Sequence, residues 1–244
     1  MNAVDQLRRL VGGCRTALGR KALRSGVAAM VQPQPMLRRL GPSFVVDVGA
    51  NRGQFALDVL EAAPGARILS IEPLSSEAAV YRRVLGGRPE CKLVECAAGS
   101  SAGQAVIHVS SRADSSSLLP IGHLQSSVFR RTAERRTESV VVHPLDELLA
   151  DVMLPDRSML KIDVQGTELD VLRGVDRRIH EFLWIYLEVS FMPFYVGQPL
   201  AGEVLEHLVS HDFTVVDLGR PVRRRGRTLQ VDVLCERRGN GSRY

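Results

Sequence analysis

Apolar and polar positions follow two alternating patterns along this chain, and each pattern predicts one kind of element. Short, nearly continuous apolar runs predict buried strands, and they lie at residues 44–48, 67–71, 92–96, 159–163 and 182–189. Apolar residues at helical spacing predict amphipathic helices, and such segments lie at residues 54–63, 75–86, 167–174 and 200–210. Strands that alternate with helices are typical of a parallel sheet covered on both faces, so we predict a doubly wound α/β fold.

The middle of the chain interrupts this alternation. Residues 104–110 alternate like an added strand, residues 139–143 form another short one, and residues 145–150 predict a short helix. Residues 111–137 between these strands are polar and rich in serine and arginine. A loop of this length inside a compact domain is usually functional or mobile. We therefore predict that residues 111–137 form a mobile lid over the site.

The N-terminal residues 1–40 precede the first strand. Their apolar residues fall at helical spacing with arginines between them, which predicts a basic amphipathic helix. These apolar residues are Val4, Leu7, Leu10, Val11, Cys14 and Leu18. Such a helix packs on the sheet or rests on a membrane surface, and both alternatives stay open at this point. Pro33 and Pro35 are expected to end the segment.

The C-terminal residues predict an antiparallel hairpin. A strand at 213–218 leads into a basic tip at 220–227, and a strand at 229–235 returns. The predicted organisation is therefore an N-terminal helical cap over residues 1–40, an α/β domain over residues 41–236 and a disordered tail over residues 237–244.

The first predicted strand runs into a glycine turn that has the features of a nucleotide site. Gly49 and Gly53 carry no Cβ, so the backbone can turn sharply and approach a ligand closely. A helix that begins near Gln54 would direct free N–H groups at that ligand. An acidic residue about twenty positions further on is expected to bind ribose hydroxyls. Glu72, which ends the second apolar run, fits that role.

The spacing of this turn differs from that of a dinucleotide fingerprint, because Asn51 stands where that pattern has a glycine. Asp47, Gly49 and Gly53 instead resemble motif I of the class I S-adenosylmethionine (SAM) methyltransferases. Four stretches together resemble the FkbM family of SAM-dependent O-methyltransferases, of the actinobacterial glycolipid type. They are residues 45–55, 70–73, 145–148 and 160–174, within a match from about residue 44 to 236.

The resemblance implies a seven-stranded Rossmann-like sheet with a C-terminal antiparallel hairpin and N-terminal helices. It also implies SAM as the cofactor and methyl transfer to a hydroxyl of a sugar on a glycolipid or secondary metabolite. The implied cofactor-binding residues are Asp47, Gly49, Asn51, Gln54, Phe55, Glu72, Pro73, Ala97 and Asp163. The family usually has glutamate where this chain has Gln165, which puts in doubt any role that needs a charge there.

An alcohol oxygen is a poor nucleophile until its proton leaves, so a general base is expected. The candidates are Asp163, Glu188 and His123, because Asp163 and Glu188 end predicted strands and His123 lies in the predicted lid. His143 precedes a proline at a strand end, and we expect it to be structural. The sequence contains no close ligand cluster that would support a metal site at Asp163.

Composition indicates a soluble globular protein. The chain has 244 residues, is 45% hydrophobic and carries a net charge of +5. Its apolar runs are too short to span a bilayer, and the early arginines are not followed by the apolar core of a secretory signal. The four cysteines, Cys14, Cys91, Cys96 and Cys235, show no metal spacing. We read them as buried thiols of a cytoplasmic protein.

Arginines concentrate at residues 8–24, 130–136 and 220–227. Such stretches can bind nucleic acid, an anionic membrane or acidic substrates, or can simply be solvated. Aromatic residues are scarce near them, which argues against nucleic acid. We expect a small-molecule or lipid-linked glycan acceptor and peripheral contact with the inner membrane face. The alternatives are an NAD-dependent oxidoreductase and a nucleic-acid-binding or nucleic-acid-methylating protein.

Overall fold

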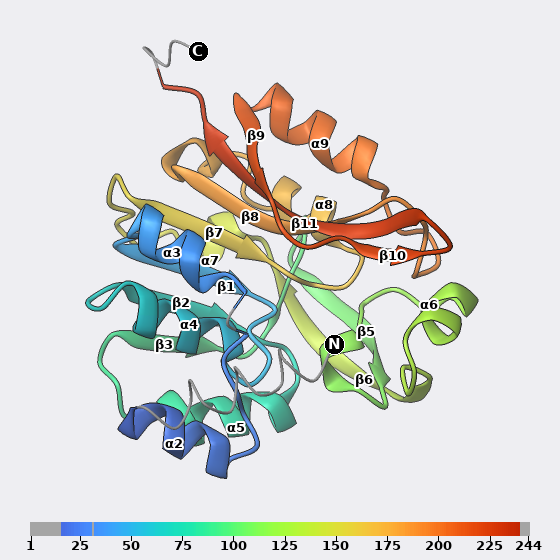
Figure 1. The fold of residues 1–244 in the computed structure, drawn as a ribbon, viewed down its shortest axis with the longest axis horizontal. Coiled ribbons are helices and arrows are strands. Elements are labelled where there is room, and N and C mark those ends of the chain that lie inside the picture. Colours follow the sequence, from blue (N-terminus) through green and yellow to red (C-terminus); the bar gives the residue numbers. More distant parts are fainter. Residues whose placement is uncertain (1–15, 31, 240–244) are drawn as a thin grey trace. The chain divides into compact units, whose positions relative to one another are not determined.

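The structure is a computed structural model that describes residues 16–30 and 32–239. The chain divides into two compact units, residues 1–95 and 96–244, and each is described by itself (Figure 1). None of the helices in the described part of the chain combines the length and the apolar character that crossing a bilayer needs.

The first unit contains a parallel sheet of three strands, β1 (Phe44–Val48), β2 (Arg67–Ile71) and β3 (Cys91–Val94), with β2 in the middle. All five residues of β1 are buried. Helix α4 (Gln54–Ala62) connects β1 to β2, and helix α5 (Ser75–Leu85) connects β2 to β3. The predicted strands 44–48 and 67–71 are confirmed residue for residue, whereas the third strand starts one residue earlier and ends two residues earlier than predicted.

Two helices precede this sheet. The predicted amphipathic helix falls largely on residues 1–15, outside the described part of the chain. Helix α2 (Ala17–Arg24) begins after Thr16, whose Oγ1 accepts a hydrogen bond from Gly19 N (2.9 Å). The expectation that Pro33 and Pro35 end the helical segment is wrong, because they start helix α3 (Gln34–Leu40). Proline is tolerated in the first helical turn, where its missing N–H has no intrahelical acceptor.

The segment between α2 and α3 is held on α4 by a buried carboxylate. Asp58, which is fully buried on α4, accepts hydrogen bonds from Met30 N and Gln34 Nε2, both at 2.8 Å. On α2, Lys21 Nζ donates to the carbonyl of Val84 in α5 (2.9 Å). The described residues that precede the sheet are therefore packed parts of the first unit.

The second unit contains a mixed sheet built around strand β11 (Arg227–Arg237). Strands β7 (Ser158–Ile162) and β8 (Trp184–Ser190) pair in parallel, and β11 pairs with β8 in the antiparallel sense. Strands β9 (Phe213–Leu218) and β10 (Val222–Arg224) pair with the other edge of β11. The predicted C-terminal hairpin is confirmed. Among the described residues, these five strands and the three of the first unit make eight instead of the predicted seven, because β10 lies in the predicted tip.

Three helices complete the core of the second unit. Helices α7 (Leu145–Leu148) and α8 (Glu168–Arg173) flank β7 in the sequence, and α9 (Ala201–Ser210) precedes β9. A short 3-10 helix, η2 (Ile179–Glu181), leads into β8. The strand–helix alternation predicted from the apolar pattern is present, and the α/β class is confirmed.

A smaller sheet of the second unit contains β4 (Ala97–Ala98), β5 (Gly103–Ser110) and β6 (Glu134–His143). The prediction that residues 111–137 form an open loop is wrong. They contain the 3-10 helix η1 (Ala113–Ser115), helix α6 (His123–Val128) and the start of β6. Apolar side chains of this segment pack on Phe194, Tyr195 and Leu229; they are Leu119, Ile121, Leu124, Val128 and Phe129. Its ordering by ligands stays a prediction.

Candidate active site

The turn after β1 is held in place by the end of β2. Its residues Gly49, Asn51 and Gly53 have φ angles of 74°, 50° and 88°, in the left-handed region that favours glycine. The N–H groups of Gly49 and Ala50 both donate to the carbonyl oxygen of Ile71, at 3.0 Å. The predicted strand–turn–helix arrangement is therefore present in the first unit.

Glu72 connects this turn to the start of α5. Its Oε2 accepts a hydrogen bond from Asn51 N and its Oε1 accepts one from Leu74 N, both at 2.8 Å. The side chain is buried. Each carboxylate oxygen has a second lone pair and can accept a further bond. Glu72 thus has a structural role that the sequence did not predict, and its acceptor capacity still suits the predicted binding of ribose hydroxyls.

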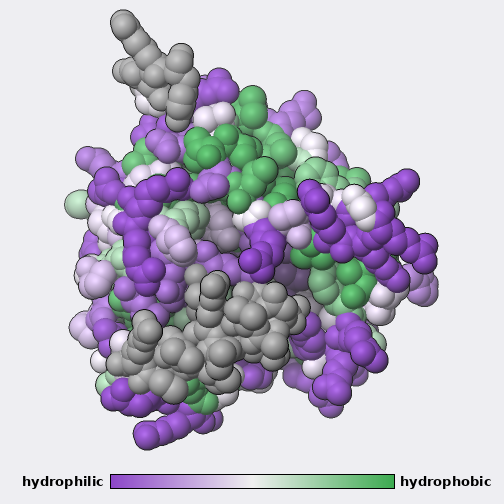
Figure 2. Space-filling model, in the orientation of Figure 1, coloured by the Kyte–Doolittle hydropathy of each residue, from purple (hydrophilic) through white to green (hydrophobic). Residues whose placement is uncertain are grey.

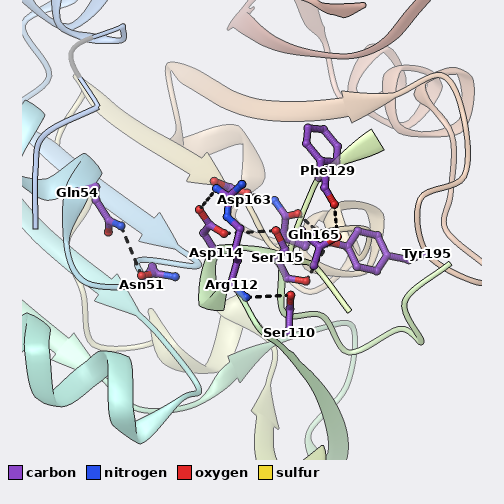
Figure 3. Close-up of polar contacts among 11 residues, drawn as sticks. Asn51, Gln54, Ser110, Arg112, Asp114, Ser115, Phe129, Asp163, Gln165 and Tyr195 are labelled. Atoms are coloured by element: carbon purple, nitrogen blue, oxygen red, sulfur yellow. Dashed lines mark hydrogen bonds and ion pairs between the residues drawn. The ribbon is translucent and has the colours of Figure 1, made fainter. Parts of the chain in front are cut away.

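The turn also contains a small polar network. Asn51 Oδ1 accepts from Arg52 N (2.8 Å) and from Gln54 Nε2 (3.5 Å) (Figure 3). The guanidinium of Arg52 pairs with Glu77 in the first turn of α5, with Nε 2.5 Å from Oε2. Asn51 and Gln54 therefore orient each other, and the Arg52–Glu77 pair is a contact that sequence spacing did not indicate.

Other predicted cofactor residues lie deeper in the fold. Asp47 and Phe55 are completely or almost completely buried, and Pro73 is half-buried. Asp47 lies beside Ser70 in the β1–β2 register. Ala97, which follows the predicted strand at residues 92–96, lies in β4 and pairs with Val142 of β6. Contact of these residues with a cofactor stays a prediction.

Gly53 has a packing role as well as a conformational one. A Cβ at this position would lie 2.7 Å from Leu85 Cδ1 and 2.9 Å from Tyr81 Cδ2, and both side chains are fully buried. We expected Gly53 to allow close approach of a ligand, whereas the structure shows close approach of α5.

We expect Gly53→Ala to lower the free energy of unfolding by about 2–4 kcal/mol, through overpacking and left-handed strain together. Gly65→Ala is the matched control, because Gly65 also has a positive φ (94°) but nothing within 4 Å of the added Cβ. Only the strain of about 1–2 kcal/mol should remain there. Equal losses in urea denaturation would contradict the packing role.

Four carboxyl groups of the second unit interact, and we call them the carboxyl cluster: Asp163, Glu168, Glu188 and Asp232. Asp163 follows β7 and Glu168 is the first residue of α8. Glu188 of β8 lies directly opposite Asp232 of β11 in the antiparallel register. Like charges in such a pair repel each other, so protonation of one group removes the repulsion on the other.

Burial and mutual repulsion raise the pKa values of three members of the carboxyl cluster. Burial raises the pKa of Glu168 to about 7. Burial and the charge of Asp163 raise the pKa of Asp232 to about 6 and raise that of Glu188 well above its ordinary value. Several displaced pKa values in one place are characteristic of functional sites.

Gln165 is the hydrogen-bonding centre beside the carboxyl cluster (Figure 3). Its Nε2 donates to Asp163 Oδ1 (2.7 Å), and its Oε1 accepts from Tyr195 Oη (2.8 Å). Its backbone oxygen accepts from Ser117 Oγ (2.6 Å), which fixes the residue at a φ of 59°. A glutamate carboxylate at this position could not donate to Asp163, whereas the amide of Gln165 does.

The other predicted bases differ in their surroundings. Glu188 belongs to the carboxyl cluster and accepts a hydrogen bond from Gln230. His123 is exposed at the start of α6, and no hydrogen bond or ion pair within the described residues joins it to the cluster. His143 Nδ1 lies 3.2 Å from Glu147 Oε2, which agrees with a structural role. The geometry therefore favours Asp163 and Glu188 over His123.

The raised pKa of Glu168 predicts a pH effect on stability. Between about pH 4.5 and 7 the unfolded glutamate has lost its proton while the folded one retains it, so the free energy of unfolding falls as pH rises. The loss should be on the order of 3 kcal/mol, complete above about pH 7. We expect Glu168→Gln to remove this loss. Denaturation at pH 5 and pH 8 should then show that the free energy of unfolding of the variant increases with pH relative to that of the native chain. A constant difference would contradict the prediction.

Comparison with known proteins identifies the family. A sequence model of the methyltransferase FkbM domain matches residues 47–215. The chain belongs to this family. It is therefore a methyltransferase, and the alternative of an NAD-dependent oxidoreductase is set aside.

Relatives of this FkbM-domain methyltransferase agree with that assignment. The chain is 26% identical to the 2-O-methyltransferase NoeI of Sinorhizobium fredii over 79% of this chain and 78% of that protein. A putative O-methyltransferase from Klebsiella pneumoniae has a similar fold, with 15% identity, a TM-score of 0.57 and coverage of 98% and 97%. The methyltransferase FkbM from Methylobacillus flagellatus has 17% identity and a TM-score of 0.50, over 80% of this chain and 44% of its own.

Several residues of the candidate site of this FkbM-domain methyltransferase were missed from the sequence; they are Glu168, Tyr195, Gln230 and Asp232. Tyr195 lies in an irregular segment after β8, and only the fold brings its hydroxyl to Gln165. Asp232 and Gln230 alternate with buried apolar residues in β11, which is the ordinary pattern of a half-exposed strand. Their place beside Glu188 depends on the strand register, which the sequence does not display.

Proposed function

We propose that this methyltransferase transfers the methyl group of SAM to a hydroxyl of a sugar, on a glycolipid or a secondary metabolite. The observation that carries the proposal is the carboxyl cluster with its ordered amide, Gln165. Carboxylate and amide oxygens accept hydrogen bonds from hydroxyls, and a cluster of acids disfavours an anionic acceptor.

The residues of the first unit suit SAM. When bound, SAM supplies an activated methyl group on its sulfonium. Glu72 would hold the ribose hydroxyls through its two carboxylate oxygens, which also accept hydrogen bonds from Asn51 N and Leu74 N. The turn 49–53, whose backbone is fixed on Ile71, would border the amino acid part of the cofactor.

The residues of the second unit suit activation of a hydroxyl. The side chain of Asp163 is 37% exposed and accepts a hydrogen bond from Gln165, so it can receive a proton from an acceptor alcohol. Lys161 Nζ lies 3.9 Å from Asp163 Oδ2 and forms an ion pair with it. The name of the relative NoeI specifies methyl transfer to oxygen, which supports oxygen as the accepting atom here.

Binding and transfer measurements test the proposal in two steps. Calorimetry should show binding of SAM and of its demethylated product, and no binding of NAD. Radiolabelled SAM should then label a lipid-linked glycan or a glycoside. Labelling of RNA in place of glycans would overturn the proposed acceptor, and failure of SAM to bind would overturn the cofactor.

We also propose peripheral contact with an anionic membrane, through the tip of the β10–β11 hairpin. Arg223, Arg225 and Arg227 are exposed there, and each basic residue near such a surface contributes on the order of 1 kcal/mol. Replacing the three arginines by glutamine should reduce co-sedimentation with anionic vesicles at low salt. Deleting residues 1–15 tests the N-terminal contribution, because a longer deletion would remove the buried Ala22 and Val27. An intact chain that stays in the supernatant would contradict membrane contact.

A further inference from the structure

Three potential metal ligands of the second unit meet between α8 and α9. Asp176 lies in the turn after α8, His207 lies on α9, and His211 caps the C-terminal end of α9. Asp176 Oδ1 is 3.1 Å from His207 Nε2 and 3.7 Å from His211 Nε2. One ligand atom from each residue lies within 4.8 Å of the others.

The spacing of these atoms suits a small tetrahedral cation. Two ligands bound to a tetrahedral zinc ion at about 2.0–2.1 Å lie about 3.3–3.4 Å from each other. The observed separations of 3.1 and 3.7 Å bracket that value. The two histidines are four residues apart, so the helix places them on one face. Small rotations of the Asp176 and His211 side chains, which are 46% and 29% exposed, would complete the geometry.

The tautomer of His211 is already the one that a metal needs. Its Nδ1 lies 2.8 Å from the backbone oxygen of His207, which can only accept a hydrogen bond. Nδ1 therefore carries the proton, and the lone pair is on Nε2, the atom nearer to Asp176. Metal-binding histidines usually have such a bond from their second ring nitrogen, because it fixes both the ring and the tautomer.

The Nε2 atom of His207 is a buried polar atom without a hydrogen bond among the described residues. Asp176 Oδ1 is nevertheless close to it, at 3.1 Å. The contact with Asp176 is therefore near enough but poorly aligned for a hydrogen bond. A cation between the two groups would satisfy both of them.

We propose that Asp176, His207 and His211 bind one divalent transition-metal ion of the zinc type, with water at the fourth position. Imidazole and carboxylate are suitable ligands for such an ion. The ion would fix the end of α9 to the turn after α8. The carbonyl groups at the C-terminal end of α9 favour a cation there. The neighbouring charge of Arg173 opposes it, but that side chain is 54% exposed, so solvent weakens its effect.

The test uses the full chain without a polyhistidine tag, freed of metal by a chelator. We expect calorimetry to show one Zn²⁺ per chain and Co²⁺ to give a tetrahedral absorption spectrum without a thiolate charge-transfer band. A thiolate band would indicate that the metal binds to one or more of the four cysteines of the chain instead of the proposed site. His211→Ala and Asp176→Asn should each weaken binding at least about tenfold. Loss of a residue that only hydrogen-bonds to a metal ligand already weakens binding by about 10- to 100-fold, and these two residues are proposed ligands themselves.

His180→Ala is the matched control, because His180 is an exposed histidine of the same unit outside the group. Metal should raise the Tm of the native chain and of this control, and should leave that of His211→Ala unchanged. Asp176 is 46% exposed and His211 is 29% exposed, so both variants are expected to fold. Absence of saturable binding, a thiolate band, or equal affinity in the native and His211→Ala chains would overturn the proposal.

Discussion

Glu72→Ala is expected to weaken binding of SAM and of its demethylated product by about 10- to 150-fold. The estimate corresponds to the 1.5–3 kcal/mol of hydrogen bonds to a charged group, which the two ribose hydroxyls would make with one carboxylate. Calorimetry with the demethylated product avoids turnover during the measurement. A folded Glu72→Ala chain with unchanged affinity would refute the ribose assignment.

The same substitution should destabilise the protein, since Glu72 also accepts hydrogen bonds from Asn51 N and Leu74 N. Each donor that loses its acceptor in a buried place costs about 1–3 kcal/mol. Glu72→Gln separates the two effects, because its amide keeps one acceptor oxygen and a similar volume. Glu90→Ala is a control in the same unit, because the side chain of Glu90 forms an ion pair with the nearby Arg88. It should leave cofactor affinity unchanged.

Elements whose pattern is set by burial could be predicted from the sequence. Strands β1, β2 and β9 begin and end at the predicted residues, because a run such as Phe44–Val48 is apolar apart from one residue and ends at a glycine. The turn and Glu72 followed from their spacing after those strands. These features depend on neighbours in the sequence, and local patterns are sufficient for them.

The missed features depend on distant partners. The apolar residues of 111–137 are scattered among serines and arginines, so the segment reads as a polar loop. They form a core only with Phe194, Tyr195 and Leu229, which lie far along the chain. In the same way, Asp232 joins the carboxyl cluster through the β8–β11 register. Sequence spacing cannot show which strands will be neighbours.

Exposed apolar residues gather on β9, which forms an edge in the second unit. Val215, Val216 and Leu218 are 40%, 36% and 62% exposed, and Figure 2 shows an apolar patch over β9. The sequence predicted β9 correctly but not this surface, because alternation alone suggests one buried face. Its exposed apolar residues lie on both faces, since Val215 and Val216 are adjacent and successive residues of a strand point to opposite faces.

Asp163→Asn is expected to lower kcat by about 10²- to 10⁴-fold, the usual contribution of a general base. Asparagine has nearly the same shape and still accepts a hydrogen bond from Gln165 Nε2, which lies 2.7 Å from Asp163 Oδ1, but it cannot take the proton of an alcohol. The measurement is methyl transfer in a single turnover at saturating SAM and acceptor. A role of Asp163 in cofactor binding alone would change the Kd of SAM and leave this rate unchanged.

Glu188→Gln is the matched control for the base. Burial and the charge of Asp163 raise the pKa of Glu188, which favours its protonated form, and glutamine has nearly the same shape as that form. Its replacement should therefore change kcat by less than about tenfold, because glutamine reproduces the protonated carboxyl group. A large loss in Glu188→Gln with a small loss in Asp163→Asn would move the base to Glu188. Equal small losses would show that alignment of the acceptor, with no base from the carboxyl cluster, accounts for the rate.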